Sequence, residues 1–323
     1  MHTMTTKPSE FIQLHHASDQ QLRAELSAGL LAASAYASPK YFYDALGSKL
    51  FAAICELPEY YLSRTEASIF DAYLGEIAEA VGVGGTLIDL GAGNCAKAAR
   101  LFPALLPAQY VPVDISVDFL RDAVGDLQQR FPHIQMTGLG LDFSSALRLP
   151  DRVQRDRRTF FYPGSSIGNF TPDEAVDFFR RLHAACEDDG GLLIGVDLVK
   201  ATEILDAAYN DALGVTASFN LNLLLHLNRL LGADFDIAGW RHVSFFNTAQ
   251  SRIEMYLEAR HAVTVQWQGG ERRFQKGERI HTENSYKYTP EDFVQLLQQA
   301  GFKVTRTWND ANDWFLVCHA RAM

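Results

Sequence analysis

The chain has 323 residues, of which 47% are hydrophobic and 21% charged, and its formal net charge is -10. The composition is that of a globular protein with a sizeable core, in one large domain or two moderate ones. The acidic balance argues against nucleic acid or an anionic membrane as a partner, because either would need a basic protein face. No apolar run approaches the ~20 residues of a membrane span, and residues 1–10 lack the apolar core of a signal peptide. We therefore expect a cytoplasmic protein with a disordered start.

The four cysteines and ten histidines show no metal-binding pattern. The cysteines are scattered without a C-x-x-C pair, which fits small buried side chains in a reducing compartment. The histidines include no H-E-x-x-H or similar ligand spacing, so we assign no metal.

Predicted strands and helices alternate from residue 64 to residue 198. A capping box at Ser63-x-x-Glu66 predicts the start of a helix that extends to about Val81. A second helix is expected over residues 96–105, and Thr171-Pro172 predicts the start of a third. The predicted strands cover residues 86–90, 110–114, 134–141, 159–162 and 192–196. This alternation is typical of a doubly wound parallel sheet, a Rossmann-like α/β fold.

The pattern changes after residue 201. Residues 202–231 are mostly helical, with Gly214 as an interruption, and residues 240–288 favour antiparallel strands with a turn at Gly269-Gly270. A helix from Thr289 then leads into the last two strands. These are expected at residues 302–308 and 314–320. An antiparallel pair at the edge of a parallel sheet is typical of methyltransferases rather than dehydrogenases.

The first predicted strand ends in the motif Asp89-Leu-Gly91-Ala-Gly93. Two glycines in a tight turn let a ligand approach the backbone closely. The spacing Gly91-x-Gly93-x-x-Ala96 also fits the dinucleotide fingerprint G-x-G-x-x-G/A. Asp89 discriminates between the two, because a carboxylate before the first glycine repels a pyrophosphate and suits a cation such as S-adenosylmethionine. The motif predicts a methyltransferase-type site, and a dinucleotide enzyme or a ligand-free turn stays open.

Acids recur at three successive strand ends, at Asp89, Asp114 and Asp142. Asp114 lies roughly 20 residues past the glycine turn, where an acid normally binds the ribose hydroxyls. Asp142 and Phe143 are placed to bind the adenine. Lys97, at the start of the next helix, is placed to reach the carboxylate of S-adenosylmethionine. The purely structural interpretation is that the acids are solvated helix caps and the lysine lies on the surface.

The end of the fourth strand is the expected acceptor side. Residues 164–169 form a loop with two glycines, and we interpret Asn169 as a donor to a substrate carboxylate, unless the loop is only a turn that caps the next helix. Aromatic residues crowd at 41–43 and 60–61. On this evidence alone lobe packing is favoured for them, although tyrosines also line amine-methylating pockets, where their rings attract developing cations.

Several further stretches carry a more specific pattern. They are Tyr43-Asp44-x-x-Gly47-Ser48-x-Leu50-Phe51, Leu57-Pro58-Glu59-Tyr60-Tyr61-x-x-Arg64-Thr65-Glu66, Gly164-Ser-Ser-Ile-Gly-Asn169, Asp197-Leu-Val-Lys200, Ala208-Tyr209-Asn-Asp211-x-x-Gly214-Val-Thr-Ala217-x-Phe219-Asn220, Arg252-Ile-Glu-Met255 and Thr282-Glu283-x-Ser285-x-Lys287. Together they cover nearly the whole chain after about Pro39. In this order they resemble the histidine-specific Nα-methyltransferase family, whose members make hercynine, the first intermediate of ergothioneine biosynthesis.

The resemblance implies two sets of site residues. Those implied to hold S-adenosylmethionine are Gly91, Lys97, Asp114, Asp142 and Phe143. Those implied to hold histidine are Asn169 and Tyr209 at the carboxylate, Tyr43 and Gly164 near the α-amine, and Tyr60, Met255, Glu283 and Ser285 around the imidazole. Tyr43 is the candidate catalytic residue, because it is the one expected to orient the amine and accept a hydrogen bond from it.

The implied reaction is an in-line displacement of methyl from a sulfonium to a neutral amine, with three rounds giving Nα,Nα,Nα-trimethylhistidine. The acceptor could instead be another α-amino acid or an indole derivative, but a buried Glu283 would be unfavourable beside an apolar ring. Two different classes of protein also stay open, a nicotinamide-dependent oxidoreductase and a non-catalytic amino-acid sensor. We expect a monomer whose partner is a small molecule.

These interpretations divide the chain into two parts. Residues 63–200 and 287–323 are predicted to form the S-adenosylmethionine-binding domain. Residues 11–62 and 201–286 are predicted to form a substrate-recognition lobe.

Overall fold

The structure is a computed structural model that describes residues 9–14, 18–115, 117–144, 146–187 and 189–323. The chain divides into two compact units. The described residues of unit 1 are 9–14, 65–115, 117–144, 146–187, 189–198 and 288–323, and those of unit 2 are 18–64 and 199–287.

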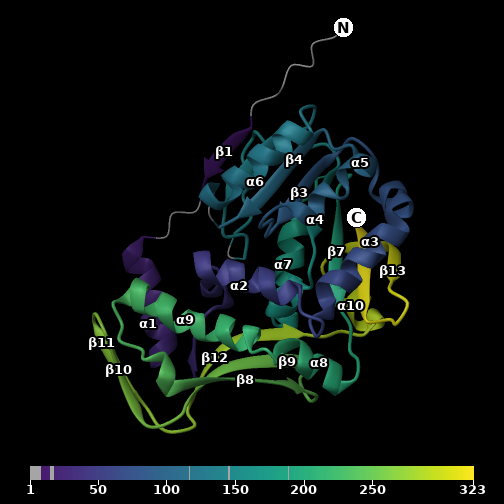
Figure 1. The fold of residues 1–323 in the computed structure, drawn as a ribbon. Helices are drawn as coiled ribbons and strands as arrows, with labels where there is room; N and C mark the ends of the chain where they lie inside the picture. The colour runs from purple at the N-terminus through teal and green to yellow at the C-terminus, as the bar shows by residue number, and fades with distance from the viewer. Residues whose placement is uncertain (1–8, 15–17, 116, 145, 188) are drawn as a thin grey trace. The chain divides into compact units, whose positions relative to one another are not determined.

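Unit 1 is built on an eight-stranded sheet with the order β1-β5-β4-β3-β6-β7-β14-β13. Strands β3 and β4 are labelled near its middle in Figure 1. Its parallel strands are β1 (Glu10–Gln13), β3 (Thr86–Leu90), β4 (Gln109–Asp114), β5 (Gln135–Gly140), β6 (Arg158–Tyr162) and β7 (Gly191–Asp197). Its antiparallel pair is β13 (Phe302–Asn309) and β14 (Phe315–Ala322). The predicted doubly wound fold and its closing antiparallel pair are confirmed.

The strand order places a topological switch point at β3. The chain runs from β3 to β4 and β5 on one side, and it returns to β6 and β7 on the other. In open α/β sheets, ligands bind outside the carboxyl ends of the strands at such a point. The glycine turn that follows β3 therefore lies where the fold predicts a ligand site.

Helices connect the strands of this sheet. They are α3 (Tyr61–Val81), α4 (Ala96–Ala99), α5 (Phe102–Leu105), α6 (Val117–Arg130), α7 (Pro172–Ala185) and α10 (Pro290–Gln299). The predicted start of α7 is confirmed, because Thr171 is its N-cap and forms a capping box with Glu174. The single helix expected over residues 96–105 is wrong: it is divided into α4 and α5, with Pro103 in the first turn of α5. Proline has no N–H to continue the helix before it.

The N-terminal strand corrects one predicted boundary. Sequence analysis assigns Phe11 to the second lobe, but β1 pairs in parallel with β5 and so belongs to unit 1. Gly138 and Gly140 make room for it, because a Cβ at either would lie 2.7 Å or less from the side chain of Phe11 or Gln13. Disorder is expected over residues 1–10. Residues 1–8 lie outside the described residues, whereas Glu10 begins β1.

Unit 2 contains a four-stranded sheet with the order β2-β12-β9-β8 and a separate hairpin. The sheet strands are β2 (Ala35–Tyr36), β8 (Trp240–Asn247), β9 (Arg252–Ala259) and β12 (Arg279–Tyr286). The hairpin strands are β10 (Val263–Trp267) and β11 (Gly270–Phe274). The helices are α1 (Asp19–Leu31), α2 (Ala45–Cys55), α8 (Thr202–Tyr209) and α9 (Val215–Leu231).

Helices α8 and α9 pack on β8 and β9 (Figure 1). The face of β9 toward this core carries Ile253, Met255 and Leu257, all buried, and these apolar residues alternate in sequence with Glu254 and Tyr256. Among the described residues, none of the helices combines the length and the apolar character needed to cross a membrane.

Candidate functional site

The glycine turn after β3 is held against the end of β4. Gly91 and Gly93 have φ of 69° and 53°, a conformation that favours glycine. The backbone N–H groups of Gly91 and Ala92 donate to the Val113 carbonyl oxygen at 2.9 and 3.0 Å. The N–H of Gly93 donates to Oδ2 of Asp114 at 3.2 Å. Two of the predicted cofactor residues, Gly91 and Asp114, are therefore brought together at one edge of the sheet.

Asp142 and Phe143 follow β5, the strand next to β4. Oδ1 of Asp142 accepts from the Ser144 N–H at 3.1 Å, which fixes the loop after the strand. The Phe143 ring packs 5.9 Å from the Tyr162 ring and 6.1 Å from the Phe178 ring, centroid to centroid. A Cβ at Gly91 would lie 3.8 Å from the Phe143 ring, so this ring borders the glycine turn.

Asp89 lies beneath the turn. It is buried, and its Oδ2 accepts a hydrogen bond from the Tyr110 hydroxyl at 2.7 Å. Burial raises the pKa of Asp89 to about 7, although the Tyr110 hydrogen bond and the charge of Lys97 act in the opposite direction. The Asp89 carboxyl is therefore buried and hydrogen-bonded to Tyr110. It can act on a ligand only through its charge and not by direct contact.

Lys97 makes a contact that sequence analysis does not predict. Its Nζ lies 2.6 Å from Oε2 of Glu66, whose side chain is only 1% exposed. The other carboxylate oxygen of Glu66 accepts from the Gly164 N–H at 2.7 Å. The predicted Ser63–Glu66 capping box is therefore wrong: α3 begins at Tyr61, so Glu66 lies inside the helix and faces the sheet.

The sequence feature that could have identified Glu66 as a buried acid is its position in the helical pattern. It precedes Ile69 and Phe70 at the i, i+3, i+4 spacing of a buried helix face, and both are buried. An acid within such an apolar face needs a partner, because a buried, unpaired carboxylate is unfavourable. The sequence shows the anomaly but not that the partners are Lys97 and Gly164.

The loop after β6 has an unusual backbone. Gly164 and Ser165 both have positive φ, 81° and 62°, and a short 3-10 helix, η2 (Ser166–Asn169), follows. The Ser165 hydroxyl accepts from the Asp197 N–H at 2.9 Å. Asn169 ends η2 and is half-buried. It is not the cap of α7, because Thr171 takes that position.

Tyr209, Ser285 and Lys287 form a buried polar cluster in unit 2. The Tyr209 hydroxyl donates to Ser285 Oγ at 2.9 Å. The ammonium of Lys287 donates to Tyr209 at 3.0 Å and to Ser285 at 2.9 Å, and this lysine is only 2% exposed. Lys287 lies within a matching stretch but sequence analysis assigns it no role. Its spacing of two from Ser285, which predicts that both side chains point to the same side of an extended chain, is the signal that could have found it.

Glu283 and Ser285 lie on the same face of β12, with Met255 of β9 directly opposite Glu283. All three are buried. Burial raises the pKa of Glu283 to about 7, and the positive charge of Lys287 acts against that rise. In the described part of the chain, no side-chain hydrogen bond reaches the Glu283 carboxyl. The face thus carries an acid, a hydroxyl and an apolar wall at close spacing.

Aromatic rings continue from this cluster. The ring of Tyr60 lies 6.2 Å from that of Tyr209 and 6.2 Å from that of Phe51, centroid to centroid. Tyr43 contacts Phe51 at 5.6 Å and Phe219 at 5.8 Å, and it is 47% exposed. Burial raises the pKa of Tyr60 well above its usual value. Within unit 2, Tyr43, Tyr60 and Tyr209 therefore form one aromatic chain, which Phe51 and Phe219 complete.

The backbone of Tyr209 is fixed by residues that sequence analysis does not identify. Nε2 of His242 and the hydroxyl of Ser244, both on β8, contact the Tyr209 carbonyl oxygen at 2.9 and 3.0 Å. Nδ1 of His242 lies 2.8 Å from the Asn220 amide nitrogen. Burial lowers the pKa of His242. A neutral ring that donates from Nε2 and accepts at Nδ1 satisfies both contacts.

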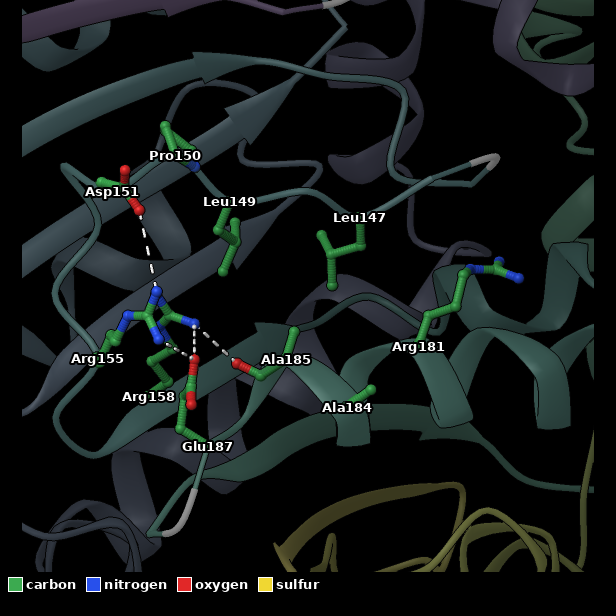
Figure 2. A pocket seen from close by; sticks show the side chains of 10 residues that line it. All are labelled: Leu147, Leu149, Pro150, Asp151, Arg155, Arg158, Arg181, Ala184, Ala185 and Glu187. Atoms are coloured by element: carbon green, nitrogen blue, oxygen red, sulfur yellow. Dashed lines mark hydrogen bonds and ion pairs between the residues drawn. The ribbon is translucent and has the colours of Figure 1, made fainter.

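A separate cavity of about 210 Å³ lies in unit 1 (Figure 2). The charges of four of its lining residues balance, because Arg155 and Arg158 lie 3.5 and 3.4 Å from Glu187, and Arg155 also lies 3.9 Å from Asp151. Figure 2 also shows Arg181 directed away from these charges. None of the predicted site residues lines it, so the cavity is not part of the candidate site.

The strand order, the glycine turn at the switch point and the acids at successive strand ends define an S-adenosylmethionine-dependent methyltransferase. More particularly, the family described as histidine-specific, SAM-dependent methyltransferases matches residues 22–322, and the chain belongs to this family.

Curated relatives agree with this assignment. The chain is 41% identical over 297 residues to the histidine N-alpha-methyltransferase of Mycolicibacterium smegmatis, and the match covers 90% of this chain and 92% of the relative. It is 37% identical over 307 residues to the enzyme of the same name from Mycobacterium tuberculosis, covering 93% and 95%. Ergothioneine biosynthesis protein 1 of Schizosaccharomyces pombe is 28% identical, and the match covers 81% of this chain but 36% of that relative.

Proposed function

We propose that this enzyme transfers methyl groups from S-adenosylmethionine to the α-amine of L-histidine, and that three rounds give Nα,Nα,Nα-trimethylhistidine. The observation that carries the proposal is the face of β12 with Glu283 and Ser285, opposite Met255. An imidazole has two nitrogens and apolar ring carbons, which such a face can match. The names of the mycobacterial relatives, histidine N-alpha-methyltransferase, support the same substrate.

In unit 1, the side chains at the ends of β3, β4 and β5 suit S-adenosylmethionine. Asp114 would bind the ribose hydroxyls, Asp142 and Phe143 the adenine, and Lys97 the amino-acid carboxylate. The glycine turn at Gly91 lets the ligand approach the backbone. When bound, S-adenosylmethionine supplies a methyl group on a sulfonium, which favours attack by an uncharged amine.

The histidine side of the proposal rests mainly on unit 2. Glu283 would accept from an imidazole N–H, while Ser285 would contact the other ring nitrogen. Tyr209 would bind the carboxylate, and we propose Asn169 of unit 1 for the same group. Tyr60 and Met255 would form the walls around the ring.

The α-amine is assigned to Tyr43 and Gly164. The amine must lose a proton before it attacks, and the Tyr43 hydroxyl can accept a hydrogen bond from it while water takes the proton. Holding the nucleophile and the methyl carbon ~3–3.5 Å apart and in line could account for ~7–11 kcal/mol of the barrier. Catalysis then depends on positioning rather than on a strong base.

Mass spectrometry of the products tests the proposal. Purified enzyme, incubated with histidine and S-adenosylmethionine, should yield histidine heavier by one, two and finally three methyl groups. Nα-acetylhistidine is the matched control, because its blocked α-amine should leave it unmodified. Methylation of the control would place the reaction on the imidazole. No methylation of histidine, in enzyme that still binds S-adenosylhomocysteine, would indicate a different acceptor.

A further inference from the structure

Glu66 connects two loops of unit 1 that sequence analysis treats as separate. One of its carboxylate oxygens accepts from the Gly164 N–H, and the other binds the Lys97 ammonium, at 2.7 and 2.6 Å. Gly195 in β7 makes room for it, because a Cβ there would lie 2.2 Å from Oε1 of Glu66. The carboxylate thus ties α4, which follows the glycine turn, to the start of the loop after β6.

Lys97 also limits the space beside Gly164. A Cβ at Gly164 would lie 2.9 Å from Nζ of Lys97, so a larger residue would displace the ammonium. Gly164 and Ser165 are consecutive residues with positive φ, a conformation that costs energy for serine and persists only where surrounding contacts hold it. Glu66 holds the first of these residues, and the Asp197 N–H donates to the second.

We infer that Glu66 is a positioning residue for both ligands of the methyl transfer, because it holds the Lys97 ammonium for one and the loop of residues 164–169 for the other. The inference rests on the proposed function, which assigns Lys97 to S-adenosylmethionine and Asn169 to the amino acid. The Lys97 side chain is 42% exposed, and its long stem would sample many conformations without the ion pair. Fixing it before the ligand arrives lowers the ordering cost of binding.

The hydrogen bond from the Gly164 N–H to Glu66 fixes the loop of residues 164–169 before a ligand binds. Its first N–H would otherwise need water or another acceptor, and the turn could adopt other conformations. An acid that served stability alone would change the melting temperature and leave both ligand affinities unchanged, so separate binding measurements distinguish the two roles.

Two variants at Glu66 separate its two contacts. E66Q keeps an oxygen for the Gly164 N–H but loses the charge that holds Lys97, whereas E66A loses both contacts. Calorimetry would measure the Kd of S-adenosylhomocysteine, and then the Kd of histidine with S-adenosylhomocysteine saturating. E66Q should weaken S-adenosylhomocysteine binding ~10-fold, as expected for losing one charged hydrogen bond, and change histidine binding by less than about twofold. E66A should weaken both about 10-fold.

K97M is the matched control for the charge. It should weaken S-adenosylhomocysteine binding at least as much as E66Q does, because it also removes the proposed contact with the ligand carboxylate. E66Q/K97M should show no loss beyond that of K97M, because Glu66 acts on this ligand only through Lys97. Unchanged or tighter S-adenosylhomocysteine binding in E66Q would overturn the inference. So would unchanged histidine binding in E66A.

The role of Glu66 in holding Lys97 can still be tested if one variant does not fold or if the wild type does not bind histidine. Should E66A fail to fold, the cycle of E66Q, K97M and the double variant decides, since additive losses would mean that Glu66 does not act through Lys97. Should the wild type bind S-adenosylhomocysteine but not histidine, the proposed function fails, and the same cycle still decides whether Glu66 positions Lys97.

Discussion

Each unit contains a buried glutamate with a lysine nearby, and the two pairs are built differently. In unit 1, both oxygens of Glu66 have protein donors, the Lys97 ammonium and the Gly164 N–H. In unit 2, Lys287 donates to Tyr209 and Ser285, and the Glu283 carboxyl receives no side-chain hydrogen bond from the described residues. The first acid is used to hold protein groups in place.

The second acid is left with its hydrogen-bonding capacity available. Burial without a donor raises the pKa of Glu283 to about 7, which is unfavourable for the ionised protein and is relieved when a ligand N–H binds. A ligand that lacks such an N–H leaves the carboxylate buried and unsatisfied. From this difference we expect that Glu66, whose oxygens have protein donors, organises its site, whereas Glu283, which has no side-chain donor, selects its ligand.

The largest effect is expected at the acid that selects. E283A should lower kcat/KM for histidine by up to ~10⁴-fold, because a site built around a substrate N–H discriminates on that scale. S-adenosylhomocysteine affinity should stay at the wild-type value. Adding M255V, which widens the same wall, should produce measurable activity on tryptophan. A ratio of kcat/KM for histidine to that for tryptophan that is equal in wild type and double variant would mean that Glu283 does not read the imidazole.

A smaller, paired effect is expected from two polar residues of unit 1. N169A should raise the KM for histidine by ~10–100-fold, the value of one hydrogen bond to a charged carboxylate, and leave S-adenosylhomocysteine binding nearly unchanged. D114A should do the opposite, because Asp114 is assigned to the ribose hydroxyls. Calorimetry with each ligand checks both variants. Loss of cofactor binding in N169A with histidine binding retained would reverse the assignment of the β6 loop.

The role of Lys287 is best tested by pH. An ionised Glu283 accepts a hydrogen bond from an imidazole N–H more strongly than the protonated acid does, so kcat/KM for histidine should rise with pH through about 7. K287M removes the positive charge that lowers the pKa of Glu283, so this rise should move to higher pH, by about one unit. K276M, at an exposed position in the same unit, should keep the wild-type profile. Free histidine ionises in the same way in every assay, so its contribution to the pH profile is removed when the variants are compared. An unshifted midpoint in K287M would remove Lys287 from the electrostatics of Glu283.

The smallest effect concerns stability. The pKa of Glu283 is raised from an ordinary 4.5 to about 7, so the folded state keeps a proton that the unfolded chain releases first. Its contribution to stability is present below pH 4.5 and is lost as the pH rises to about 7. E283Q cannot ionise, so its melting temperature should exceed that of wild type by a few degrees at pH about 8 and match it at pH about 4. The same difference at both pH values would show that ionisation is not the cause.

Much of unit 1 could be predicted because its signals are local. The buried run of β3, the glycine turn after it, and the Thr171–Glu174 capping box each lie within a few residues. Strand alternation then limits the sheet to a doubly wound order. The same logic failed at Glu66, where a capping-box pattern was satisfied in sequence but the helix began at Tyr61.

The sequence by itself determined most strands and helices of unit 1, the doubly wound class of its sheet and the family pattern that runs through residues 43–287. Tertiary structure alone decided which partners the buried polar groups have. The Gly164 N–H meets Glu66 across 98 residues, and Lys287 meets the Tyr209 hydroxyl across 78. The addition of β1 to the edge of the sheet beside β5 was decided in the same way, by two glycines in another strand. The physical reason is that caps and periodicity act over a few residues, whereas the partner of a buried charge is fixed only when distant segments pack together.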